Sequence, residues 1–376
     1  MKIAIVHDYL TQYGGAERVF KAIHELFPEA SVFTFIYDKK AVEKFIPLKD
    51  VHTTFLSRLP RFLRNRRRYF LPFFPVCAER FNLRDFDVVI SSSSAFANGI
   101  VVKPKTLHIS YCHSPMRFVW DWHSEYKKEQ RKGFFTNIAI DFMSNYLRIW
   151  DFLSAQRVDY FIANSQNVAD RIKKYYRRES KVIHPFFEHS HCLKNNCGGD
   201  IREPLPESYF LIISQLAPYK KIDLAVEAFN KLELPLIIIG DGKEKKRLKK
   251  MANPNIKLLG FVPEEEKWQI LAKCQALIFP GEDDFGITMA EAISVGKPVL
   301  AFSRGSAREI IQEGISGEFF DDFSVECLAE AVKRIREKLG AYDAEKIKKT
   351  AEKFSKKRFK EEFMDFFMRA TSKHKP

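Results

Sequence analysis

Short apolar runs alternate with amphipathic stretches along most of this 376-residue chain. Near its start, the apolar run Lys2–Val6 is followed by the amphipathic stretch Gly15–Phe27 and by a second apolar run, Ser31–Ile36. Apolar runs of this length are typical of buried strands, whereas a period near 3.6 residues indicates a helix. Alternation of the two predicts a parallel sheet with crossover helices.

The alternation continues in two blocks of the chain. In the first block we expect strands at Asp87–Ser91, Leu107–Tyr111 and Asp159–Ala163, with an aromatic-rich helical stretch ending near Gln156 and a helix starting at Ser165. The strands expected in the second block are Phe210–Ser214, Leu236–Ile239, Ile256–Leu259, Ala276–Phe279 and Pro298–Ala301. The helices expected between them are Ile222–Leu232, Lys243–Met251, Glu264–Lys273 and Thr288–Val295.

A change of composition separates the two blocks. Residues 187–208 are rich in His, Asn, Gly, Cys and Pro, which predicts a linker. We therefore expect an N-terminal domain at residues 1–186 and a C-terminal domain at residues 209–353. Residues 354–376 carry phenylalanines at helical spacing and are expected to form an apolar helix.

Composition indicates a globular protein of the cytoplasm. Hydrophobic residues make up 45% of the chain and charged residues 29%. We find no apolar run of the roughly 18 residues that a membrane span needs, and no signal-peptide pattern at the N-terminus. The six cysteines are scattered, as is typical of reduced thiols. Cys192 and Cys197 lie near three histidines, but their spacing matches no common zinc motif, and a polar linker explains them better.

The chain is basic, with 62 Lys and Arg against 48 Asp and Glu and a net charge of +14. The segment Arg58–Pro75 holds six arginines and no acid, interleaved with Leu, Phe and Tyr. Such a segment suits an anionic membrane surface, so we expect peripheral attachment at the inner face of the membrane. Two alternatives are a helix with solvated arginines and an RNA-binding surface. We expect no nucleic-acid partner.

Polar and glycine-rich turns follow several of the predicted strands. Gly14 and Gly15 open a helix after the first strand, where backbone without a Cβ can approach a phosphate. The pattern is not G-x-G-x-x-G, which disfavours a dinucleotide cofactor. The turn can also be an ordinary tight turn.

The stretch Tyr111–Asp121 follows another predicted strand. It brings His113, Arg117, Trp120 and Asp121 to the end of that strand, where they would form the polar, partly aromatic pocket that a sugar requires. A buried, hydrogen-bonded structural histidine is the alternative for His113.

Asp283 and Glu291 flank a turn built on Gly286, and a helix is expected to begin at about Thr288. The helix N-terminus offers N–H groups and a positive dipole end to a phosphate, and the two carboxylates can reach sugar hydroxyls. This combination favours a nucleotide-sugar as the ligand. The alternative is an ordinary strand–loop–helix unit with two solvated acids.

Taken together, these segments resemble glycosyltransferase family 4 (GT4), in particular its mannosyltransferase-like branch. Asp283 and Glu291 match the carboxylate-x7-carboxylate signature, although the first position is usually Glu. Tyr111–Asp121 resembles the family's H-S/T-P-M-R-aromatic-x-W-D segment. Ser214–Asp223 resembles R-L-x-P-x-K-x-x-D, with Lys220 at the lysine position and an uncharged Gln215 at the arginine position.

The resemblance implies the α/β GT-B fold, in which two Rossmann-like doubly wound domains face each other across a cleft. It also implies that helix 354–376 crosses back to the first domain. The implied activity is retaining transfer of a hexose, with mannose from GDP-mannose as the expected donor, to a hydroxyl of a glycan or lipid-linked glycan. No cofactor is implied beyond the nucleotide-sugar co-substrate, and no metal.

The resemblance also assigns roles to residues. The catalytic set is His113 beside the donor sugar, Lys220 on the diphosphate and Asp283 on the sugar, while Glu291 binds the ribose. The donor-binding positions are Gly14, Gly15, Gln215, Lys220, Val262, Asp283, Phe285, Gly286, Ile287, Thr288 and Glu291. Arg117, Trp120 and Asp121 lie on the acceptor side.

Other functions stay open at this point. One is a GT4 transferase that uses a UDP-sugar, and another is a GT-B epimerase acting on UDP-sugars. A third is a non-catalytic relative that binds a glycan or lipid, which the residues at positions 215 and 283 would suit. Net charge alone also admits a nucleic-acid-binding protein.

Overall fold

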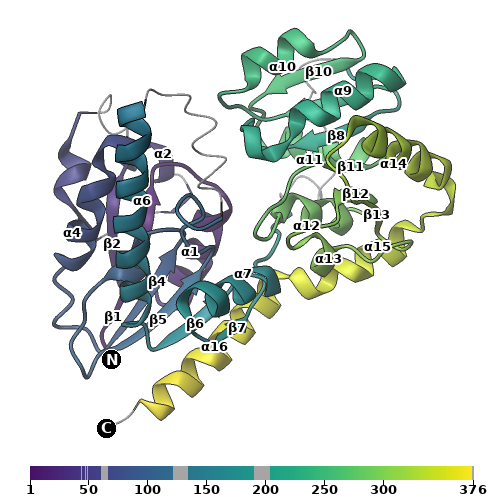
Figure 1. Ribbon diagram of the computed structural model, residues 1–376. Helices are drawn as coiled ribbons and strands as arrows, with labels where there is room; N and C mark the ends of the chain where they lie inside the picture. The colour runs from purple at the N-terminus through teal and green to yellow at the C-terminus, as the bar shows by residue number, and fades with distance from the viewer. Residues whose placement is uncertain are drawn as a thin grey trace. The chain divides into compact units, whose positions relative to one another are not determined.

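The computed structural model describes residues 1–43, 45–46, 48, 50–60, 67–121, 134–189 and 204–374. The chain divides into two compact units (Figure 1). Unit 1 comprises Met1–His184 and Phe359–Pro376, and unit 2 comprises Pro185–Arg358. Much of the expected linker, and residues 61–66 of the arginine-rich segment, lie outside the described residues.

Unit 1 is built on a parallel sheet. In its described part the strands run in the order β3-β2-β1-β4-β5-β6-β7. Their bounds are β1 Ile3–Leu10, β2 Ser31–Tyr37, β3 Val51–Thr53, β4 Val88–Ser93, β5 Leu107–Cys112, β6 Tyr160–Ala163 and β7 Ser180–Val182. The central strands β4 and β5 are buried along their whole length, as expected for a parallel sheet covered on both faces.

Helices and short helical turns pack around this sheet. The helices are α1 Gly15–Leu26, α2 Lys39–Val42, α4 Phe74–Glu79, α6 Phe134–Ala155, α7 Gln166–Arg171 and α16 Lys356–Lys373. The shorter turns are 3-10 helices at Phe55–Arg58, Arg67–Phe73 and Ala97–Gly99 and a π-helical turn at Ile172–Tyr176. From α16, Phe363 and Phe367 contact the ring of Phe27, which follows α1.

Unit 2 repeats the same architecture. Its described strands run in the order β10-β9-β8-β11-β12-β13, and all their pairings are parallel. Their bounds are β8 Phe210–Ile213, β9 Leu236–Ile239, β10 Ile256–Gly260, β11 Leu277–Phe279, β12 Val299–Phe302 and β13 Gly317–Phe320.

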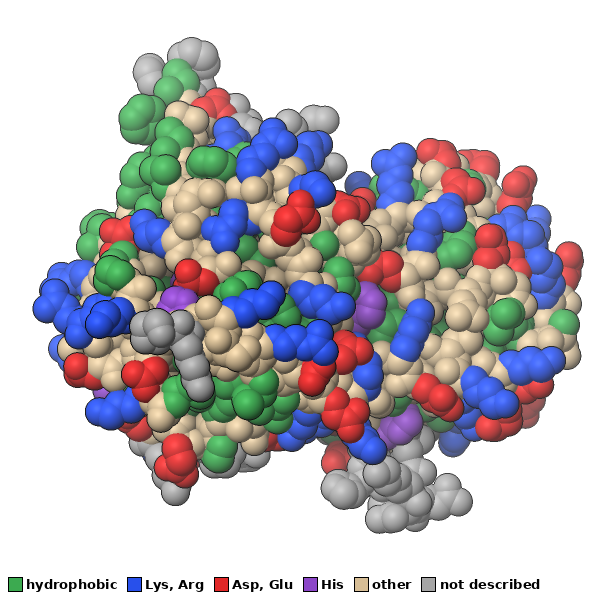
Figure 2. All heavy atoms as spheres, turned by 90° about the horizontal axis from the view of Figure 1, so that it is seen from below, with side chains coloured by type: hydrophobic (Ala, Val, Ile, Leu, Met, Phe, Trp, Pro, Cys, Tyr) green, Lys and Arg blue, Asp and Glu red, His purple; other side chains and the backbone are tan. Residues whose placement is uncertain are grey.

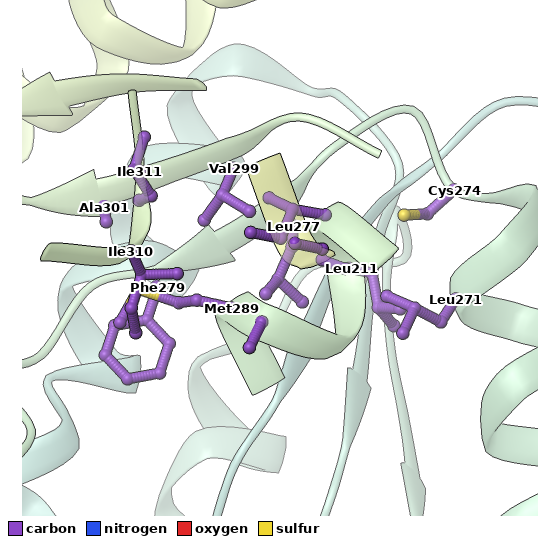
Figure 3. Packing of buried hydrophobic residues seen from close by; sticks show 14 of the residues in the cluster. Leu211, Leu271, Cys274, Leu277, Phe279, Met289, Val299, Ala301, Ile310 and Ile311 are labelled. Atoms are coloured by element: carbon purple, nitrogen blue, oxygen red, sulfur yellow. The ribbon is translucent and has the colours of Figure 1, made fainter. Parts of the chain in front are cut away.

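Helices cover both faces of the second sheet, because alternate strand residues point to opposite sides. The helices are α9 Ile222–Leu232, α10 Lys245–Met251, α11 Glu264–Lys273, α12 Ile287–Ser294, α13 Ala307–Ile310, α14 Val325–Glu337 and α15 Ala344–Ala351. Residues of α9, α10 and α14 share one apolar cluster with the sheet. Residues of α11, α12, α13 and α15 share the other, which includes Leu271, Leu277, Met289 and Val299 (Figure 3).

The structure confirms the predicted alternation and most predicted bounds within a few residues; α9, β9 and α11 match in full. Three strands were not predicted: β3, β7 and β13. All three lie at an edge of their sheet, and β3 and β7 have only three residues each. Edge strands pair on one side only, so a long apolar run is not required there.

Both sheets have a topological switch point. In unit 1, chain order reverses between the neighbouring strands β1 and β4, and in unit 2 between β8 and β11. In open α/β sheets, ligands bind outside the carboxyl ends of the strands at such a point. The two switch points are therefore the expected positions of a ligand site in each unit.

Candidate active site

The switch point of unit 2 holds an ion pair between Lys220 and Asp283. Lys220 ends the turn Pro218–Lys220 that follows β8, and Asp283 lies in the turn that follows β11. Because β8 and β11 are neighbours, their carboxyl ends bring together two residues that are 63 positions apart. Sequence reasoning selected both residues, and the structure places them in contact.

Close backbone packing holds this pair in place. A Cβ added to Gly281 would lie 2.9 Å from Cα of Lys220, so the two turns meet backbone to backbone. The hydroxyl of Ser306 donates to the carbonyl oxygens of Phe285 at 2.6 Å and of Asp283 at 3.3 Å. The turn that carries Asp283 is therefore fixed from both sides.

The N-terminus of α12 lies directly after this turn. Gly286 precedes the helix with a φ of 73°, and it has no side chain that could cap the N–H groups of the first turn. The first turn, with Ile287 and Thr288, contains no acid. A helix N-terminus of this kind attracts anions through its N–H groups and its dipole. Together with Lys220 it can hold a phosphate.

Glu291, the second predicted carboxylate, lies inside unit 2. Both of its carboxylate oxygens accept from Lys267 Nζ at 3.0 Å, and only 1% of the residue is exposed. Lys267 also donates to Glu264 at 2.7 Å. Glu264 is the first residue of α11 and follows the buried Val262 by two positions in the chain. Lys267 was not predicted, and in sequence only its i,i+3 spacing to Glu264 indicates an ion pair.

Gln215, at the family's arginine position, is exposed after β8. Phe285 is buried and packs edge-to-face against Phe354 with ring centroids 5.5 Å apart. The side chain of Phe285 thus anchors the turn in the core. Only the backbone of Phe285, next to Gly286, is left to contact a ligand.

Unit 1 contains a hydrogen-bonded row of three buried side chains. The hydroxyl of Ser92 on β4 bonds with His7 Nδ1 at 3.0 Å and with His113 Nε2 at 2.8 Å. Burial lowers the pKa of His113 to about 3, helped by the neighbouring His7, and burial lowers the pKa of His7 to about 4. Both rings are therefore neutral at pH 7. The hydroxyl has one proton, so it donates to one ring and accepts from the other.

The switch point of unit 1 is filled by the chain itself. The carboxylate of Asp8 accepts the backbone N–H groups of Ser94, Ala95, Phe96 and Ala97 at 2.5–2.9 Å. Burial raises the pKa of Asp8, and the four N–H groups act in the opposite direction.

The glycine turn of unit 1 is also satisfied internally. The N–H of Gly14 donates to the carboxylate of Glu17 at 3.0 Å, so this group is already bonded at the start of α1. Gly15 is the first residue of the helix. A donor phosphate at this turn would meet the carboxylate of Glu17. The geometry therefore favours sugar hydroxyls over phosphate as ligands of the turn.

The three residues predicted for the acceptor side lie close together in the chain. Trp120 donates from Nε1 to Asp151 at 2.8 Å and stacks on Tyr175. Asp121 accepts from the hydroxyl of Tyr175 and pairs with Arg171 at 3.1 Å. Arg117 is half-buried. Trp120 and Asp121 thus fix the end of this loop onto α7 and the π-helical turn.

Within the described ranges, no group of three or more His, Cys, Asp or Glu side chains is placed to hold a metal ion. Cys192 and Cys197 lie outside those ranges.

Two doubly wound parallel units of this kind form the GT-B fold of glycosyltransferases. The crystal structure of Anabaena Alr3699/HepE in complex with UDP-glucose superposes on 98% of this chain and 100% of that chain, with a TM-score of 0.68 and 18% identity. Two family models match the sequence: "Glycosyltransferase Family 4" over residues 13–191 and "Glycosyl transferases group 1" over residues 199–354. The chain belongs to glycosyltransferase family 4.

Two relatives are named for an activity. O-antigen chain mannosyltransferase C of Escherichia coli is 24% identical over 239 residues, which cover 61% of this chain and 62% of the relative. This match therefore spans less than two thirds of that relative's length. Alpha-1,3/1,6-mannosyltransferase ALG2 of Dictyostelium discoideum is 24% identical over 84% of this chain and 85% of its own length.

Proposed function

We propose that this protein is a retaining glycosyltransferase that moves a hexose from a nucleotide diphosphate to a hydroxyl of a glycan or lipid-linked glycan. Mannose from GDP-mannose is the proposed donor, because the two relatives described above are mannosyltransferases by name. The observation that carries the proposal is the Lys220–Asp283 pair beside the N-terminus of α12, at the switch point of unit 2.

In the proposed reaction, the bond between the anomeric carbon and the diphosphate oxygen breaks and a bond to the acceptor oxygen forms on the same face. The acceptor hydroxyl gives its proton to the leaving phosphate. Negative charge grows on the diphosphate, and Lys220 with the α12 N–H groups stabilises it. Asp283, released from Lys220 as the diphosphate binds, accepts hydrogen bonds from the donor sugar. We propose no metal in this step.

The remaining residues position the donor. Glu291 is proposed to accept a ribose hydroxyl on a lone pair that Lys267 leaves available, since a carboxylate offers about four acceptor sites. Val262 is proposed to lie against the base through its backbone, and neutral His113 to meet the sugar. Arg117, Trp120 and Asp121 are proposed to shape the acceptor side. An anionic membrane reached through Arg58–Pro75 would present a lipid-linked acceptor, with the protein peripheral at the cytoplasmic face.

Thermal unfolding with GDP, UDP, ADP and their sugar conjugates, each with Mg²⁺ and with EDTA, tests the proposal. A ligand at 100 times its Kd stabilises the folded state by about 2.7 kcal/mol. We expect a shift with GDP and GDP-mannose and none with UDP or ADP. A shift with UDP compounds alone would replace the donor, and a shift that requires Mg²⁺ would contradict the metal-free step.

Thermal unfolding with the same nucleotides, together with two product assays, separates the alternative functions. Absence of any nucleotide shift would favour a non-catalytic glycan- or lipid-binding relative. Conversion of a UDP-sugar to its epimer without an acceptor would favour the epimerase. Transfer to added glycan with retention of anomeric configuration, followed by NMR, would support the proposal directly.

A further inference from the structure

Helix α6 of unit 1 exposes an apolar face. Its side chains Ile138, Phe142, Tyr146, Ile149 and Leu153 are 41–77% exposed, with Phe142 the most exposed. Their spacing of four, four, three and four residues places all five on one side of the helix. At 1.5 Å per residue this face is about 22 Å long. The opposite side of α6, with Leu147 and Trp150, packs into the core of unit 1.

The charged residues of α6 do not interrupt this face. Its described part contains three of them: Asp141, Arg148 and Asp151. Asp151 is buried, and the guanidinium of Arg148 donates to the carbonyl oxygen of Val119 and lies over the ring of Trp120. Asp141 is half-buried. The exposed positions of α6 thus hold no charged side chain.

Helix α14 of unit 2 shows what an ordinary surface helix of this protein looks like. It has a buried apolar side, with Leu328 and Val332 in the core. Its exposed residues are all charged: Glu326, Glu330, Lys333, Arg334, Arg336 and Glu337. Both helices bury an apolar side, but the exposed side of α14 is charged and that of α6 is apolar. An uncharged apolar face of this length on a protein with 29% charged residues marks an interaction surface.

Other apolar side chains are exposed on segments of unit 1 near α6. Trp150 of α6 donates from Nε1 to Glu79 at the end of α4, so the two helices are neighbours (Figure 1). Val76 on α4 and Phe73 just before it are each 50% exposed. Figure 2 shows hydrophobic side chains gathered in a patch at the upper left of the view, whereas charged side chains cover much of the remainder.

Charge indicates which partner this face fits. By sequence, unit 1 contains 34 Lys and Arg against 21 Asp and Glu, a net charge of +13. Unit 2 contains 28 against 27, a net charge of +1. Nearly all of the chain's net positive charge is therefore on the unit that exposes the apolar helix. A second copy docked on the same face would bring two such units together, and their like charges would repel each other.

We propose that the exposed face of α6 docks on an anionic lipid bilayer, with its five apolar side chains in the headgroup–acyl boundary. Apolar burial and attraction of the basic unit to anionic lipid would then act together, as in other interfacial helices. None of the helices in the described part of the chain is long and apolar enough to cross a membrane, so α6 would lie on the surface. The proposal is independent of the proposed binding of the donor diphosphate by Lys220 and α12.

The test is co-sedimentation of the protein with vesicles of phosphatidylcholine, either pure or containing phosphatidylglycerol. We expect binding to the anionic vesicles and about tenfold weaker binding of the double variant Phe142→Ala, Ile149→Ala, which removes apolar area without changing charge. Alanine is also the better helix former, so the variant should fold. Phe142→Glu with Ile149→Glu should abolish binding.

Matched controls isolate the role of α6. Lys333→Glu on the exposed side of α14 changes the net charge by the same two units as the double Glu variant, and it should leave most of the binding in place. Unchanged thermal stabilisation by nucleotide shows that the variants keep the donor site. Equal binding of wild type and the Ala variant, equal binding to both vesicle types, or loss of a dimer in the Ala variant on ultracentrifugation would each overturn the proposal. The last result would assign the face to self-association.

Discussion

The two units share one strand order but treat their switch points in opposite ways. In unit 1, Asp8 accepts four backbone N–H groups after β4, and Glu17 accepts the N–H of Gly14. The chain's own carboxylates thus take the places that a ligand's phosphate oxygens would take. In unit 2, α12 begins after a glycine and its first turn has no side-chain cap, while the nearby Asp283 is paired with the cation Lys220.

This difference teaches that strand order alone does not decide where a phosphate binds. A parallel sheet offers helix N-termini at its switch point in either unit. What decides is whether a fixed carboxylate already occupies those groups. Unit 1 is therefore expected to contribute neutral groups such as His113 to the reaction, and unit 2 the charge that stabilises the leaving group.

The largest expected effect comes from removing the cation at the unit 2 switch point. Lys220→Ala should lower kcat about a thousandfold, because the leaving diphosphate loses its paired cation in the transition state. Steady-state transfer assays measure this change. Lys231→Ala, which breaks an exposed ion pair with Glu326 on the same unit, serves as the control and should keep normal turnover. Near-normal kcat of Lys220→Ala would remove Lys220 from the mechanism.

The next prediction concerns the occupied switch point of unit 1. Asp8→Ala leaves four buried or half-buried backbone N–H groups without their acceptor, so the free energy of unfolding should fall by about 3 kcal/mol or more. Urea unfolding followed by fluorescence measures it. The exposed Asp87→Ala should change stability by less than about 0.5 kcal/mol. A small loss for Asp8→Ala would mean that another group or water replaces the carboxylate.

The sheets and some of the site residues could be predicted from the sequence, whereas several partners of those residues could not. The sheets were predictable because a buried parallel strand needs an apolar run. Asp283 was found because it follows such a run beside a helix start, and Lys220 because its segment resembles a family motif. The partners His7, Ser92 and Lys267 were missed. His7 and Ser92 are 85 residues apart, and only the register of β1 against β4 brings them together. No local pattern contains that register.

Unit 1 should also give the protein its sensitivity to acid. Burial lowers the pKa of His7 from 6.5 to about 4, so between these values the unfolded chain binds a proton that the folded state does not. Stability contributed by neutral His7 is therefore present above pH 6.5 and lost as the pH falls toward 4. His7→Gln should reduce the slope of unfolding free energy against pH by about 1.4 kcal/mol per unit in that range. An unchanged slope in His7→Gln would contradict the assignment.

The hydroxyl between the two histidines offers a prediction for catalysis. Ser92→Ala removes the group that orients His113 and should lower kcat about tenfold with little change in KM, since a small misplacement of a reacting group is costly. Its neighbour Ser91 makes the equivalent bond to His108, at 2.9 Å, on the other side of β4. Ser91→Ala therefore provides a matched control that should keep kcat. If both variants lose the same activity, the row His7–Ser92–His113 is structural only.

The smallest expected effect is on nucleotide affinity, when one more cation is added at the switch point of unit 2. Gln215 is exposed after β8, at the family's arginine position, so Gln215→Arg should restore a second cation near Lys220. A charge-assisted bond to the diphosphate contributes about 1 kcal/mol at an exposed site, which corresponds to about fivefold tighter nucleotide binding. Isothermal titration calorimetry at two salt concentrations measures it, and the gain should shrink at high salt. Gln312→Arg adds the same charge in the loop before β13, toward the amino ends of the strands, and should bind as wild type does. If both variants gain equally, the improvement reflects net charge of unit 2, and position 215 would not face the diphosphate.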